Sequence, residues 1–131
     1  MKTKKAGIFS LPDLESLLAK WQKLLRLQDW RVRIYYARRF DLSPEVQAET
    51  VMSQKTKDAI IRILDPIDAD PNTFPPQTRP NRVEESIVHE LLHFHLRSFF
   101  PPPNETNKDE EVAICSIASA LMALNARKEN G

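Results

Sequence analysis

Cysteine is nearly absent from this chain, and neither sign of charge predominates. Cys115 is the one cysteine among 131 residues, which excludes an internal disulfide framework and is typical of a reducing compartment. Its neighbours in the sequence are apolar, so we expect a buried structural thiol rather than a nucleophile. The 19 Lys and Arg residues nearly balance the 18 Asp and Glu residues, and therefore no overall field attracts the chain to nucleic acid or to an acidic surface.

Long hydrophobic runs are also missing. No apolar stretch approaches the ~20 residues that cross a bilayer, and the basic start at residues 1–5 is not followed by the apolar core of a signal peptide. We therefore expect a cytoplasmic protein that does not act at a membrane. The length fits one domain over residues 1–131, with residues 1–9 and 127–131 frayed.

The first half of the chain predicts a helix followed by a small sheet. Ser10 is a candidate N-cap, and leucines at helical spacing continue from it to about Leu27. Apolar and polar residues then alternate over residues 30–36, which predicts a half-buried strand. Residues 49–54 and 58–65 predict two more strands joined by a turn. We expect a mostly antiparallel sheet and an α+β fold.

The second half predicts a long connection and two helices. Residues 66–80 contain five prolines and predict a surface segment that lines a cleft. Asn81 is a candidate N-cap for a helix that continues to about Ser98. A last helix over residues 110–127 is rich in Ala, Ile and Leu and is expected to be buried.

All three histidines of the chain lie in the first of these two helices. His89, Glu90 and His93 form the pattern H-E-x-x-H. Residues four apart share one face of a helix, so both imidazoles can bind one ion while Glu90 flanks a water molecule as general base. His95 lies about 200° around the helix from His93 and is expected on the opposite face. The alternative is that the histidines are ordinary core or surface residues.

Two histidines leave a catalytic zinc site incomplete, because such sites usually have three protein ligands and a water. Glu110 and Glu111, at the start of the last helix, are the candidates for the third ligand. Glu110 projects onto the centre of the apolar stripe of that helix, where an unpaired carboxylate is costly, and Glu111 borders the stripe. A capping role for Glu110 is also open, since Asn107 is spaced from it as in a capping box. The sequence therefore leaves Glu110 and Glu111 as alternatives.

This pattern resembles the gluzincin branch of the zinc metallopeptidases, typified by thermolysin. The short chain and the strands before the motif look more like minimal single-domain zincins, similar in layout to ImmA/IrrE-like proteins. The resemblance implies a zincin-like fold, one Zn²⁺ per chain, His89 and His93 as ligands and Glu90 as the base. It also implies that one strand of the sheet binds an extended peptide along the cleft.

The resemblance implies a metallopeptidase, a hydrolase of peptide or protein substrates. One expected part is missing, since no histidine follows His95 to stabilise an oxyanion. Tyr35, Tyr36 and Arg97 are the candidates to replace it. The alternative function is a zincin-fold module that binds protein or nucleic acid without cleaving it, and the arginines that motivate this alternative are Arg31, Arg33, Arg38 and Arg39. A solvated strand face is the preferred interpretation of these arginines, so we do not expect nucleic acid as a partner.

Overall fold

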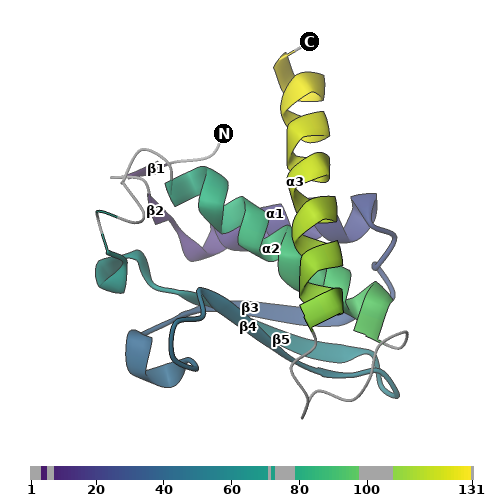
Figure 1. Cartoon of the computed structure of the whole chain (residues 1–131), viewed down its shortest axis with the longest axis horizontal. Coiled ribbons are helices and arrows are strands. Elements are labelled where there is room, and N and C mark those ends of the chain that lie inside the picture. The colour runs from purple at the N-terminus through teal and green to yellow at the C-terminus, as the bar shows by residue number, and fades with distance from the viewer. Residues whose placement is uncertain (1–3, 6–7, 71, 73–78, 98–107, 131) are drawn as a thin grey trace.

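The computed structural model describes residues 4–5, 8–70, 72, 79–97 and 108–130. Three helices and a three-stranded sheet form most of the described structure, together with a short two-stranded sheet at its start (Figure 1). The fold class is α+β, as the sequence predicts. The elements are β1 (Lys4–Lys5), β2 (Ile8–Phe9), α1 (Leu11–Leu24), β3 (Arg31–Ala37), β4 (Ala48–Ser53), β5 (Asp58–Leu64), α2 (Arg79–Leu96) and α3 (Lys108–Asn130).

Helices α1 and α2 cover one face of the three-stranded sheet, and α3 crosses α2 and extends away from the sheet (Figure 1). The main core lies between these layers because the apolar stripes of the helices face the alternating apolar side chains of the strands. Within the described part of the chain, no helix covers the other face of the sheet, where Val51 and Ile60 are exposed. The most deeply buried core residues are Leu14, Leu17, Trp21, Ile61, Ile87, Val88, Leu91 and Ile114.

The sheet has the order β3-β5-β4 and is mixed. Strand β4 pairs antiparallel with β5 through a tight turn, in which Lys57 has a φ of 57°. Strand β3 pairs parallel with β5, with Ile34 beside Ile61, so the prediction of a mostly antiparallel sheet was wrong for this pair. The chain between β3 and β4 crosses to the far edge of the sheet, which leaves the centre to β5.

Helix α1 begins as the sequence predicts. Ser10 is its N-cap, and its hydroxyl accepts a hydrogen bond from the backbone N–H of Asp13 at 3.2 Å. The helix ends at Leu24, earlier than predicted, because Arg26 adopts a φ of 59° that no helix can continue. Residues 8 and 9, expected to be frayed, form β2, and the Tyr36 hydroxyl donates a hydrogen bond of 2.7 Å to the Phe9 carbonyl.

Helix α2 begins at Arg79 rather than after Asn81, with Pro80 in its first turn. Proline fits there because the first N–H groups of a helix have no partner within the helix. The Glu84 carboxylate then joins α2 to α1, since it accepts hydrogen bonds from Trp21 Nε1 at 2.7 Å and Lys20 Nζ at 2.9 Å.

Helix α3 differs most from its prediction. It runs to Asn130, beyond residue 127 where fraying was expected. It is not a buried helix, because among residues 109–128, whose burial the structure describes, only Glu110, Ile114 and Ala118 are buried. No helix of the described segments is both long and apolar enough to cross a bilayer.

The N-cap of α1 gives a test of this fold. We expect Ser10→Ala to lower the free energy of unfolding by about 1 kcal/mol, because the N–H of Asp13 loses its acceptor. Ser16→Ala is the matched control, since Ser16 is exposed within the same helix and alanine is the better helix former. Urea unfolding of both variants measures the difference, and equal stability of the two would contradict the capping role of Ser10.

Candidate metal centre

The two histidines of the H-E-x-x-H pattern lie one turn apart on α2, on the side that faces the first turn of α3. The ring centroids of His89 and His93 are 5.3 Å apart. This is the arrangement that the four-residue spacing predicts. It results from the helix itself, because Val88, Leu91 and Leu92 anchor the neighbouring face in the core.

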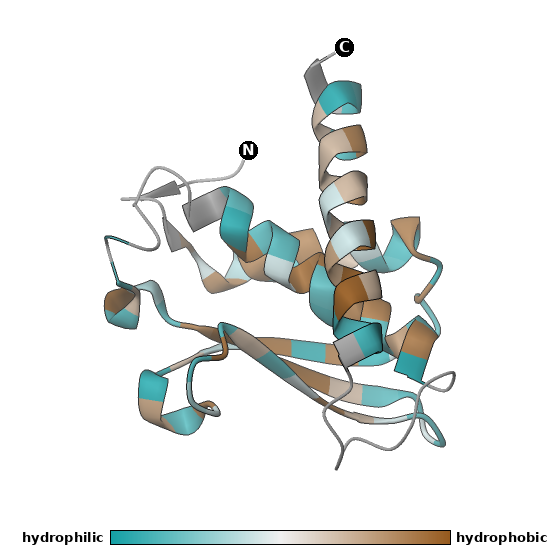
Figure 2. Cartoon of the chain, in the orientation of Figure 1, coloured by the Kyte–Doolittle hydropathy of each residue, from teal (hydrophilic) through white to brown (hydrophobic). Residues whose placement is uncertain are grey.

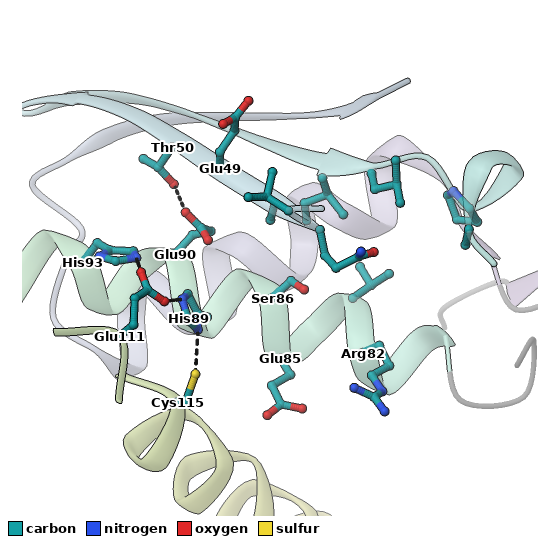
Figure 3. A pocket seen from close by; sticks show the side chains of 18 of the residues that line it. Glu49, Thr50, Arg82, Glu85, Ser86, His89, Glu90, His93, Glu111 and Cys115 are labelled. Atoms are coloured by element: carbon teal, nitrogen blue, oxygen red, sulfur yellow. Dashed lines mark hydrogen bonds and ion pairs between the residues drawn. The ribbon is translucent and has the colours of Figure 1, made fainter. Parts of the chain in front are cut away.

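The Glu111 carboxylate meets the Nε2 atoms of both histidines. Its Oε2 lies 3.0 Å from His89 Nε2, and its Oε1 lies 3.2 Å from His93 Nε2. Figure 3 shows this carboxylate between the two rings. Of the two glutamates that the sequence leaves open, Glu111 is therefore the one placed where the two imidazoles converge.

Glu110 contacts the opposite side of the His93 ring. Its Oε2 lies 2.7 Å from His93 Nδ1 and 3.2 Å from Arg97 Nε, and its side chain is only 3% exposed. Burial acts against ionisation, but the hydrogen bonds from His93 and Arg97 prevail and lower the pKa of Glu110. The prediction that Glu110 faces the core is confirmed, and its buried carboxylate is paired with His93 and Arg97.

The hydrogen bond to Glu110 sets the tautomer of His93. An ionised carboxylate accepts a hydrogen bond from an N–H at Nδ1, and the tautomer with its proton on Nδ1 has a lone pair on Nε2. That lone pair faces an oxygen of Glu111 at 3.2 Å, and two acceptors repel each other unless a proton or a cation lies between them. A metal ion that takes both lone pairs satisfies this arrangement.

Two of the separations among these atoms are close to those of a tetrahedral site. Ligands bound to zinc at about 2.0–2.1 Å in a tetrahedron lie roughly 3.3 Å from one another. The separations of 3.0 and 3.2 Å between Glu111 and the two histidines are close to that value. A histidine that binds a metal through one ring nitrogen usually donates the N–H of the other nitrogen to a carboxylate. The contact between His93 Nδ1 and Glu110 is of this kind. His89, His93 and Glu111 thus offer donor atoms of the kinds that Zn²⁺ binds. Among the described residues, two groups have ligand atoms that all lie within 4.8 Å of one another: His89, Glu90 and His93, and His89, Glu111 and Cys115.

Glu90 lies beside these donors and is buried, at 6% exposure. The ligand atoms of His89, Glu90 and His93 all lie within 4.8 Å of one another. Burial raises the pKa of Glu90, although the hydroxyl of Thr50 donates a hydrogen bond of 2.6 Å to its Oε1. This hydrogen bond holds Oε1 of Glu90 against Thr50 of β4, and Oε2 is the oxygen that can accept a proton.

These groups line a cleft of about 630 Å³ between α2, α3 and β4. One end of the cleft holds the histidines and carboxylates, and Cys115 borders it (Figure 3). Pro66 and Ala69, in the segment predicted to line a cleft, do so. The remainder of the lining is mixed, with apolar side chains from Val46, Ala48, Ile63, Leu64 and Val83 and polar ones from Gln47, Glu49, Arg82, Glu85, Ser86 and Arg97.

His95 lies away from this cleft, as its angular position predicts. Its Nε2 donates a hydrogen bond of 2.7 Å to the carbonyl of Leu25, at the end of α1. Cys115 is exposed rather than buried, because it projects from the side of α3 that borders the cleft. Its Sγ lies 3.9 Å from His89 Nδ1, and desolvation, followed by the charges of Glu111 and Glu85, raises the pKa of its thiol.

Of the three residues considered for stabilising an oxyanion, only Arg97 borders the cleft. Its guanidinium already contacts Glu110 and lies 3.2 Å from His93 Nδ1. Tyr36 bonds to the backbone of Phe9, and Tyr35 lines a separate cavity against α1. The structure therefore does not bring a tyrosine to the donors.

The arginines that motivated a binding function are largely engaged. Arg31 forms an ion pair with Asp58 at 2.8 Å, and Arg38 forms one with Asp68 at 2.7 Å. Arg39 donates to the carbonyls of Ser43 and Val46.

Thr50 is a part of the site that the sequence did not identify, and Arg97, which the sequence offered for an oxyanion, has a different role here. Arg97 follows His93 by four residues, so its contact with Glu110 and His93 could have been anticipated from helical spacing. Thr50 lies in a different element, forty residues before Glu90, and no local pattern points to it.

Comparison of the chain with protein-family models, with curated proteins and with solved structures finds no significant match. The functional argument consequently depends on the geometry of the described residues.

Proposed function

We propose that this chain is a zinc-dependent peptidase of the zincin type. His89, His93 and Glu111 would hold the metal, and Glu90 would be the general base. The observation that carries the proposal is the convergence of both Nε2 atoms on the Glu111 carboxylate, beside a buried Glu90. Three protein donors leave a fourth position for water, as in other catalytic zinc sites.

When bound, zinc would act as a Lewis acid that makes water a nucleophile near neutral pH and polarises a carbonyl. The residues of the chain supply the rest of the reaction. Glu90 accepts the proton of the attacking water as the new carbon–oxygen bond forms, and it returns that proton to the nitrogen as the carbon–nitrogen bond breaks. Thr50 holds Glu90 in position through its hydrogen bond.

The outer edge of strand β4 supports an extended peptide as the substrate. Strand β4 pairs only with β5 among the described strands, so the backbone groups of its outer edge are available to an extended chain. Residues 46–50, which lead into β4 and form its first half, line the cleft that contains His89 and Glu90. An extended peptide can add to this edge and bring a peptide bond to the donors.

Metal content tests the donor set. We expect purified protein to bind about one zinc per chain, and His93→Ala and Glu111→Ala to lose it because each removes a direct ligand. Glu110→Ala should bind zinc about 10–100-fold more weakly, because His93 loses its orienting partner. Competition with a chromophoric chelator measures these affinities.

Asp109→Ala is the matched control, since Asp109 is an exposed acid in the same helical turn. It should bind zinc as tightly as the unmodified chain does. A chain that takes up no zinc when offered it would refute the proposal. Equal losses in Asp109→Ala and Glu111→Ala would show that the acids act through the helix rather than as ligands.

Glu90 tests the catalytic role separately from metal binding. We expect Glu90→Gln to keep its zinc and to lose at least about a hundredfold in the rate of peptide hydrolysis, because an amide cannot accept the proton. A library of unstructured fluorogenic peptides provides the assay. Glu85→Gln, the same change in a cleft residue of the same helix, should retain most of the activity; hydrolysis that survives Glu90→Gln would rule out this base.

Thr50 tests the positioning of that base. Thr50→Val removes the hydroxyl with little change of shape, and we expect kcat to fall about tenfold with zinc content unchanged, because Glu90 loses its hydrogen bond. Thr50→Ser should restore kcat, since it keeps the donor. A rise in KM with constant kcat would mean instead that Thr50 contacts the substrate.

A further inference from the structure

Helix α3 carries an apolar stripe that is largely exposed in the described structure. The stripe consists of Ala113, Ile117, Ala120 and Leu124, and we call it the outer stripe. Ile117 is 39% exposed and Leu124 is 59% exposed. In Figure 1 the later turns of α3 project beyond α1 and α2, and Figure 2 shows apolar colours along the helix between hydrophilic ends.

The spacing of the outer stripe is that of a helix that packs against another helix. Its members are separated by four, three and four residues, which places them within about 60° of one another around the axis. This side differs from the one that packs on α2, where Glu110, Ile114 and Ala118 are buried. The helix therefore has two packing faces, and the body of the protein uses one.

We propose that the outer stripe binds the outer stripe of a second copy of this chain, with the two α3 helices antiparallel. A two-fold axis near Ala118 and Ser119 would place Leu124 opposite Ala113 of the second copy. The same axis would place Ile117 opposite Ala120. Each large side chain then faces a small one, which allows two helices to approach closely and fill the space between them.

The charges at the ends of α3 select the antiparallel direction. Asp109 and Arg127 are exposed and 18 residues apart, which is five helical turns, so both flank the same side of the stripe. In an antiparallel pair Asp109 faces Arg127 of the second copy at each end. A parallel pair would place like charges together and would align the helix dipoles unfavourably.

The size of the contact predicts a weak dimer. Two large side chains from each copy provide little apolar area compared with the roughly 800 Å² per partner of a standard interface. We therefore expect a reversible dimer with a dissociation constant of about 1–100 μM. This inference does not depend on zinc binding or on catalysis.

Sedimentation of the full chain over a range of concentrations tests the dimer, with a reductant present so that Cys115 cannot cross-link the copies. Leu124→Glu should weaken association at least about tenfold, because it places a charge in the apolar contact. Val112→Glu is the matched control. Val112 is more exposed than Leu124, at 66%, but it lies on another side of the same helix, so dimerisation should be unchanged.

The direction of the pair has its own test. Asp109→Arg alone should weaken the dimer, and adding Arg127→Asp should restore it, since the exchanged charges again face each other. Circular dichroism checks that α3 remains helical in each variant. A chain that is monomeric at about 1 mM would overturn the proposal and leave a different protein as the occupant of the stripe. So would a dimer that is unaffected by Leu124→Glu, or one weakened equally by Val112→Glu.

Discussion

The crossing of α2 by the first turn of α3 is the contact on which the rest of the site depends. Two adjacent glutamates fix it, and they point to different atoms of the histidine pair. Glu110 is buried and must be paired, and it finds His93 Nδ1 and Arg97. Glu111, one position further around the helix, then necessarily reaches the Nε2 atoms of His89 and His93. The buried contact of Glu110 with His93 and Arg97 thus orients the imidazole ring of His93. It also places the Glu111 carboxylate beside both histidines.

The same contact determines which charges face the cleft. Arg97 balances Glu110 locally, at 3.2 Å, so this pair adds no net charge to the cleft. The carboxylates that remain near the two imidazoles are Glu90 and Glu111. These two carboxylates and the two imidazoles are the groups of the described residues that could bind a divalent cation here.

Local patterns predicted much of this structure, because helices and strands depend on neighbours in the sequence. The cap at Ser10, the shared face of His89 and His93 and the position of His95 all follow from spacing along one element. The parallel pairing of β3 with β5 could not be anticipated, since it depends on how the chain crosses between elements. The contact between Thr50 and Glu90 is of the same kind. The helical projection correctly gave Glu110 a core-facing position, but whether a core-facing carboxylate meets Nδ1 or Nε2 depends on the crossing of two helices.

The turn between β4 and β5 has a consequence for the chemistry of the cleft. Successive side chains of β4 point to opposite faces, so Thr50 bonds to Glu90 while the carboxylate of Glu49 bonds to Ser43 and Arg62 (Figure 3). A deletion or insertion of one residue in that turn would shift the strand by one position. Glu49 or Val51 would then stand beside the buried carboxylate, as a like charge or as a group without a donor. The length of an exposed turn therefore limits which sequences can keep the contact between Thr50 and Glu90, even though none of its residues lines the cleft.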